Sequence, residues 1–281
     1  MVAGISVETN DQIARFPDPV CPASFGFPEA FNAFVADRVR AVAGEAGIAV
    51  APAGCRPNLL VIAAGEGRDL LAALHRRRPT YFAGLVLPEI RRLSRAAGPV
   101  RSWQVVEMRG QDGRTMENVS FVRGPDGRMM YIGAARQLST DVASRLELPT
   151  RQDIVLSVVM FDLDAIEGLT LAHVADHAAM RALARTEPGA ETPSGRTIVT
   201  LFRDVRAGFA PAEALTPFDR SYLRAVYATN NGVSGRRQRA SIAGAVTRSL
   251  TDGGRERPRL ARPARRSRLN KAARRGPSGS W

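Results

Sequence analysis

The stretch DIVLSVVMFDLD, residues 153–164, constrains the fold of this chain more than any other segment. Its interior is a nearly continuous run of Ile, Val, Leu, Met and Phe, and this enrichment in β-branched residues is typical of a strand. Shortly after it, Thr170 is a good N-cap for a helix that we extend to about Arg185. A strong strand that leads directly into a helix is therefore the central unit of the predicted fold.

Further helices and strands are predicted on both sides of this unit. With 281 residues, of which 44% are apolar, the chain is long enough to bury a sizeable core. Helical spacing and capping signals predict helices at residues 27–43, 69–77, 89–96, 216–227 and 234–250. Apolar runs predict strands at residues 58–64, 100–108, 117–123 and 128–133, with the last two joined as a hairpin. We therefore predict a globular α+β protein.

The formal charge of +13 is concentrated near the end of the chain. Residues 251–281 hold ten basic residues against Asp252 and Glu256, a net charge of +8, so the other 250 residues carry only +5. This segment is rich in Arg, Gly and Pro and has almost no large apolar side chains, which predicts a disordered tail. The candidate anion-binding residues are Arg262, Arg265, Arg266, Arg268, Lys271, Arg274 and Arg275. They would give salt-sensitive contact with nucleic acid or an anionic surface, unless the tail is only a solvated extension.

Cys21 and Cys55 are the only cysteines, and each stands beside proline in a predicted loop. A disulfide between them would stabilise the fold by roughly 3 to 4 kcal/mol in the chain-entropy model, whereas the alternative is two free thiols. Residues 1–20 contain no apolar run that would serve as a signal-peptide core, and no run of about 20 apolar residues predicts a membrane span. If the disulfide forms, we expect a periplasmic or secreted protein whose true start lies upstream of Met1; otherwise we expect a cytoplasmic protein.

Two of the three histidines, His173 and His177, stand one turn apart in the helix that follows the strong strand. Imidazoles at this spacing suit zinc, and Met180 would add a soft sulfur for a His/His/Met copper set. The alternative is a pair of surface or cleft-lining histidines without a ligand, on the helix face opposite the apolar stripe. A zinc hydrolase also needs a third ligand and a general base, and Val174 occupies the position where that base usually stands.

The order of elements from residue 154 to residue 227 resembles the second half of a zincin-type metallopeptidase, the metzincin branch in particular. In that family an edge strand precedes the zinc helix, a turn with a methionine follows, and the next helix often begins Leu-Ser/Thr-x-x-Asp, as Leu215-Thr-Pro-Phe-Asp219 does here. The chain also resembles a bacterial domain family of unknown function that is related to these peptidases and has exported and lipoprotein-like members. The resemblance implies a zincin-like mixed sheet, a central helix after the edge strand, and a C-terminal helical part.

This chain departs from the motif H-E-x-x-H-x-x-G-x-x-H of the family. The first two ligands of the motif match His173 and His177, but Val174 replaces the Glu, Met180 the Gly, and Leu183 the third His. Valine cannot accept a proton from water, and leucine cannot bind a metal. The methionine of the turn is also missing from the segment that follows. The resemblance therefore implies the fold without the hydrolase activity.

These observations predict one zincin-like α+β domain at residues 15–250, preceded by a flexible N-terminus at residues 1–14 and followed by the tail. We expect a binding or envelope-associated function without peptidase activity and without a resident cofactor. Two alternatives stay open. The first is an active zinc metallohydrolase that uses His173 and His177 with a further ligand, and the second is binding of nucleic acid or an anionic surface through the tail.

Overall fold

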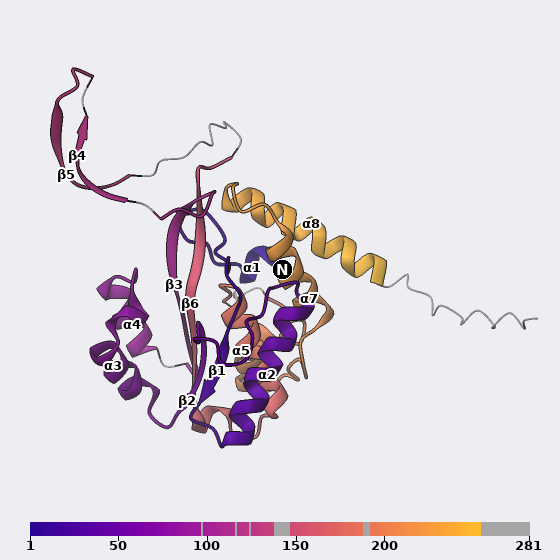
Figure 1. The fold of residues 1–281 in the computed structure, drawn as a ribbon. Coiled ribbons are helices and arrows are strands. Elements are labelled where there is room, and N and C mark those ends of the chain that lie inside the picture. Colours follow the sequence, from indigo (N-terminus) through magenta and orange to yellow (C-terminus); the bar gives the residue numbers. More distant parts are fainter. Residues whose placement is uncertain (97, 116, 124, 138–146, 188–191, 254–281) are drawn as a thin grey trace, which may run out of the picture.

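The sheet is the organising element of the fold (Figure 1). The computed structural model describes residues 1–253 except 97, 116, 124, 138–146 and 188–191. The sheet has the strand order β1-β2-β6-β3, in which β1, β2 and β6 are parallel and β3 is antiparallel to β6. Its strands are β1 (Pro22–Phe25), β2 (Leu59–Ala64), β6 (Thr150–Asp162) and β3 (Val100–Gly110). With helices on both faces, this sheet confirms the α+β class.

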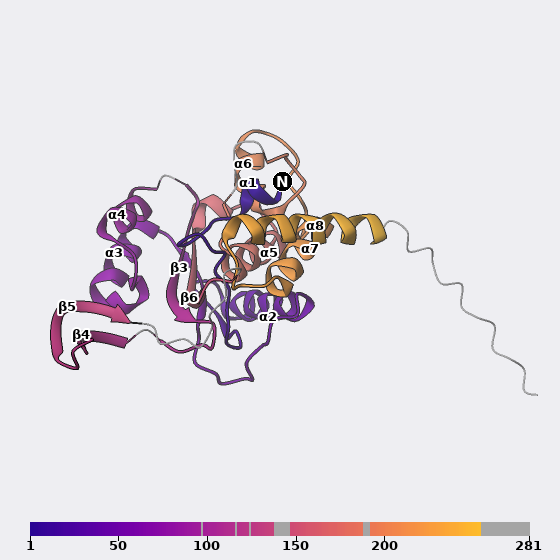
Figure 2. The same cartoon turned by 90° about the horizontal axis from the view of Figure 1, so that it is seen from above.

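Helices cover the two faces of the sheet unequally. Figure 2 shows α3 (Gly67–Arg77) and α4 (Leu87–Arg95) on one side, with α2 (Glu29–Glu45), α5 (Leu171–Leu183), α7 (Pro217–Ala228) and α8 (Gly235–Gly253) on the other. The shorter helical elements are α1 (Val2–Ile5), α6 (Leu201–Arg206), η1 (Pro79–Phe82), η2 (Leu163–Ile166) and η3 (Ile198–Thr200). Strands β4 (Glu117–Arg123) and β5 (Met129–Gln137) form the predicted hairpin, which is separate from the sheet and projects beyond it (Figure 1). None of the helices described here combines the length and apolarity that a membrane crossing requires.

The strand that precedes the histidine helix is not the edge strand that the family resemblance implies. β6 lies between β2 and β3, and β3 forms the edge. Along β6, Val158 and Met160 join the core under α3 and α4, whereas Val159 and Phe161 join the core on the opposite face. A strand that is buried on both faces has apolar side chains throughout and suits an internal position.

Helix α5 is buried on nearly all sides, and this differs from the amphipathic helix that its sequence predicts. Thr170 caps it as expected, because its Oγ1 accepts a hydrogen bond of 3.2 Å from the backbone N–H of His173. Every residue from Val174 to Leu183 is buried except Arg181. Alanines occupy much of the surface of α5, so the sheet and the other helices approach it from several directions. A helix that is apolar on all sides is typical of a protein core.

Residues 1–14 pack against the core through buried side chains and do not form the flexible lead-in that the sequence predicts. Ile5 and Ile13 are 1% and 3% exposed. The backbone N–H of Val7 donates to the carbonyl of Arg185, and that of Ile13 donates to the side chain of Gln238. This segment therefore ties the end of α5 to α8.

Buried carboxylates of α5 and α7 connect these helices to neighbouring segments through hydrogen bonds. Asp176 of α5 is fully buried and accepts hydrogen bonds from Arg38 of α2 at 2.5 Å and from the backbone N–H of Leu215 at 2.8 Å. Asp219, at the third position of α7, accepts a hydrogen bond of 2.9 Å from the backbone N–H of Ile198. Each carboxylate satisfies backbone groups that would otherwise be buried without a partner.

The structure places Cys21 and Cys55 at disulfide distance. Their Cα atoms are 6.1 Å apart, within the usual range for a disulfide, and 34 positions separate them in the sequence. The pair connects β1 to the loop before β2. The described part of the chain has no free cysteine.

Candidate functional site

His177 lies in the main core and not at a surface or in a cleft. The side chain is 3% exposed, and its ring contacts those of Phe161 and Phe202 at centroid distances of 5.9 and 5.0 Å. The pKa of His177 is lowered to about 3, mainly by burial and also by the charge of nearby Arg181, while a backbone hydrogen bond at Val199 opposes the shift. The imidazole is therefore neutral near pH 7, and its Nδ1 has no hydrogen-bond partner.

His173 belongs to the start of α5. Its Nδ1 accepts a hydrogen bond of 3.3 Å from the backbone N–H of Thr170, which completes a capping box, and its Nε2 is buried without a hydrogen-bond partner. Met180 is fully buried in the main core. Within the described ranges, no group of three or more His, Cys, Asp or Glu residues is arranged to hold a metal ion. The predicted ligands therefore serve the helix cap and the core.

The candidate anion-binding residues from Arg262 to Arg275 lie outside the described residues. Helix α8 continues to Gly253, so the predicted tail boundary at residue 251 falls within the last turn of that helix.

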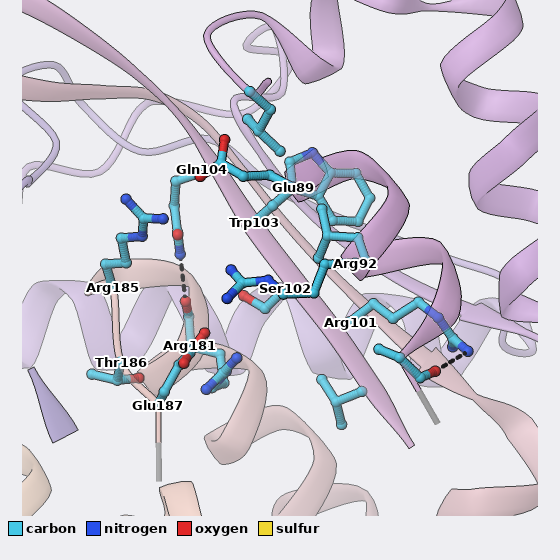
Figure 3. A pocket seen from close by; sticks show the side chains of 14 residues that line it. Glu89, Arg92, Arg101, Ser102, Trp103, Gln104, Arg181, Arg185, Thr186 and Glu187 are labelled. Carbon is cyan, nitrogen blue, oxygen red and sulfur yellow. Dashed lines mark hydrogen bonds between the residues drawn. The ribbon is translucent and has the colours of Figure 1, made fainter. Parts of the chain in front are cut away.

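A pocket beside β3 is the best candidate for a functional site (Figure 3). It has a volume of about 280 Å³ and lies between α4 and the end of α5. Its lining includes Ser102 and Gln104 of β3, Arg92 of α4, and Arg181 and Arg185. The pocket thus borders the edge of the sheet at the place where the two helical layers meet.

The backbone groups of β3 that face away from β6 are unpaired along this pocket. The carbonyl of Pro99 accepts a hydrogen bond of 3.0 Å from Asp162 N–H, and antiparallel pairing alternates along a strand. The backbone groups of Ser102 and Gln104 therefore point away from β6. In the described part of the chain, no other backbone segment bonds to them. An unpaired edge of this kind is a template for another strand.

Two polar side chains of β3 fix the walls of the pocket. The indole N–H of buried Trp103 donates to the carbonyl of Tyr81 at 2.8 Å, and its ring stacks on Phe82 with centroids 5.0 Å apart. On the other wall, the amide of Gln104 donates to the carbonyl of Arg181 at 2.8 Å, which Figure 3 marks with a dashed line. The layer of α3 and α4 and the end of α5 are thus both attached to the strand whose edge is free.

The arginines of the pocket differ in how their charge is balanced. Arg101 forms hydrogen bonds of 2.7 and 2.9 Å with the carboxylate of Asp162. Arg181 has no ion-pair partner among the described residues, and its buried Nε has no hydrogen-bond partner. Burial lowers the pKa of Arg181, and the charge of Glu187 partly offsets the shift. Arg185 donates to the hydroxyl of Thr9. The pocket thus contains a guanidinium whose charge is poorly compensated.

Comparison of the chain with protein-family models, curated proteins and solved structures gave no match. The sequence prediction also missed the pocket. Its residues come from segments that are distant in the sequence, and only the spacing of Arg181 and Arg185, four positions apart, resembles a local signal.

Proposed function

We propose that this protein is a binding protein without peptidase activity that holds an extended peptide along the free edge of β3. The observation that carries the proposal is the unpaired backbone of Ser102 and Gln104 beside a pocket with fixed walls. Strand addition uses main-chain hydrogen bonds for affinity and side-chain pockets for specificity. This site offers both.

The zincin-like architecture is part of this proposal. Strand β6 leads into α5, an antiparallel strand flanks β6, and α7 begins with a capping box formed by Thr216 and Asp219. These features support the resemblance to metallopeptidases in the arrangement of elements. They leave open the alternative in which His173 and His177 bind zinc.

The environment of α5 favours the inert form of that architecture. Val174, at the position of the general base, is 2% exposed and has no proton-accepting group. His177 packs between two phenylalanine rings and not toward a pocket. A ligand held beside β3 would therefore meet a binding surface without a water-activating group on α5.

Elemental analysis of the purified protein separates binding from hydrolysis. We expect substoichiometric zinc and no cleavage of peptides. Stoichiometric zinc that is lost in both His173→Ala and His177→Ala, together with cleavage that chelators abolish, would replace this proposal with the metallohydrolase.

Binding itself is tested with a library of twelve-residue peptides and fluorescence anisotropy. Each peptide that binds is then N-methylated at one backbone position at a time. Because alternate backbone N–H groups of an added strand face β3, affinity should fall with a period of two residues. A library without binders, or a uniform response to N-methylation, contradicts the proposal.

An oxidising compartment is the location that the cysteine pair supports. Titration of thiols in the denatured protein should find none before reduction and two after it. Two thiols before reduction, in protein isolated from its native compartment, would favour the cytoplasmic alternative.

A further inference from the structure

The guanidinium of Arg181 distinguishes this pocket from a neutral strand-binding groove. The buried Nε of Arg181 has no hydrogen-bond partner, and the same holds for the Nε of Arg101. The two arginines differ in their ion pairs, because Arg101 donates to the carboxylate of Asp162, whereas Arg181 has no ion-pair partner among the described residues. Withdrawing a cation from water without a partner is costly, so a partly buried guanidinium without an ion-pair partner favours an anionic ligand. A planar guanidinium matches a carboxylate in two parallel hydrogen bonds.

The charge of the lining sets the charge of that ligand. Apart from the pair of Arg101 with Asp162, the lining holds three arginines, Arg92, Arg181 and Arg185, and two carboxylates, Glu89 and Glu187. Glu89 is engaged, because it accepts a hydrogen bond of 3.0 Å from the backbone N–H of Val86 at the start of α4. One positive charge remains in excess. A monoanionic carboxylate balances it, whereas a dianionic phosphate would leave a negative charge in the pocket.

We infer that the peptide held beside β3 is acidic and that Arg181 receives one of its carboxylates. This inference rests on the proposed function and specifies its ligand class. Arg181 lies at the end of α5, and the bond from Gln104 to its carbonyl attaches that end to β3. Figure 3 shows Arg181 joined to Gln104 at this edge, so the anionic group of the peptide would meet the guanidinium beside the strand that pairs with the peptide backbone.

The first experiment uses the wild-type protein. A library peptide that shows the two-residue N-methylation period is resynthesised with each Glu or Asp changed to its amide, and separately with an amidated C-terminus. Loss of the recognised carboxylate should weaken binding about tenfold to a hundredfold, since it removes charge-assisted hydrogen bonds. The arm that shows the loss tells whether the carboxylate is a side chain or the chain terminus.

The second experiment assigns the carboxylate to its receptor. In Arg181→Met the acidic peptide and its neutral amide should bind with equal affinity. The control Arg91→Met removes an exposed arginine of α4 that is not part of the lining, and it should keep the full difference. Arg181→Met should also be no less stable than the wild type without peptide, because it removes a partly buried cation that has no ion-pair partner among the described residues. If that variant does not fold, Arg181→Lys, which keeps the charge but loses the planar fork, should reduce the difference.

The outcomes separate the two proposals. A peptide that shows the two-residue period but binds as well in its neutral forms overturns the acidic ligand and leaves strand addition intact. Full discrimination in a folded Arg181→Met overturns the role of Arg181. If no peptide binds at all, strand addition itself is wrong.

Discussion

The two faces of the sheet differ in how completely helices cover them. On one face, α2, α5, α7 and α8 enclose a core in which most side chains are fully buried. On the other face, α3 and α4 cover a much smaller cluster around Leu71, Phe82 and Trp103. The thick layer holds the buried carboxylates and the neutral His177, whereas the pocket opens where the thin layer ends at β3. The space that admits a ligand thus lies at the border of the two layers, outside the thick core.

This separation has a cause in the local sequence. Helix α5 is rich in alanine, so neighbouring elements approach its backbone closely, and of its residues only Arg181, near its C-terminal end, lines the pocket. The short helix α4 instead exposes Leu87 and carries arginines, and it covers only part of the strand edge. The family resemblance implies that the histidine helix α5 carries metal ligands, but in this chain α5 is a helix of the hydrophobic core.

Loss of Asp176 should have the largest effect on the thick layer. In Asp176→Leu, Arg38 loses its partner and the N–H of Leu215 is left buried without one. We expect the free energy of unfolding to fall by about 3 to 5 kcal/mol, measured by urea denaturation.

The matched change at the thin layer is Asp162→Leu, which removes the partner of Arg101 where the carboxylate is 25% exposed. A loss of only about 2 kcal/mol is expected there, because the Asp162 carboxylate accepts from Arg101, whereas Asp176 also satisfies the buried backbone N–H of Leu215. Equal losses in the two variants would show that both layers are held with the same rigidity.

Truncation of one leucine in each layer should give a smaller contrast. Leu183→Ala in α5 removes a fully buried side chain that is surrounded on all sides, whereas Leu71→Ala in α3 removes one from a thin layer that is able to relax. Leu→Ala changes in cores cost about 2 to 5 kcal/mol, and the cost falls where the surroundings collapse. Chemical denaturation should place Leu183→Ala near the upper end of that range and Leu71→Ala near the lower end. The reverse order would contradict the comparison of the layers.

The elements of both layers are predictable from sequence because their signals are local. The β-branched run of β6, the cap at Thr170 and the Thr216-x-x-Asp219 box each specify an element through neighbouring residues. Strand β1 is missed, since four residues that include Pro22 and Ser24 carry no strand pattern.

Burial and strand order depend on distant partners, and here sequence reasoning was wrong. A helix with histidines on one side has an amphipathic pattern. In the fold, however, the imidazole of His177 is buried in the core against the rings of Phe161 and Phe202. Likewise, nothing local to Gln104 or Arg181 indicates that they meet. The fold class was therefore accessible from the sequence, whereas the site was not.

The smallest of the predicted effects is in the pH dependence of stability, which should also differ between the two layers. The folded protein keeps His177 neutral down to a pKa of about 3, whereas the unfolded chain binds that proton near pH 6.5. Between these values the unfolded state holds more protons, so the free energy of unfolding falls as the pH falls, by about 2 kcal/mol from pH 6.5 to pH 5. Urea denaturation of His177→Leu should lack most of this slope. In the control His75→Gln, which removes a partly exposed histidine from α3 in the thin layer, the slope should remain. The assignment would be wrong if His75→Gln removed the slope and His177→Leu kept it. The histidine that stays neutral in the folded protein would then be His75 of the thin layer.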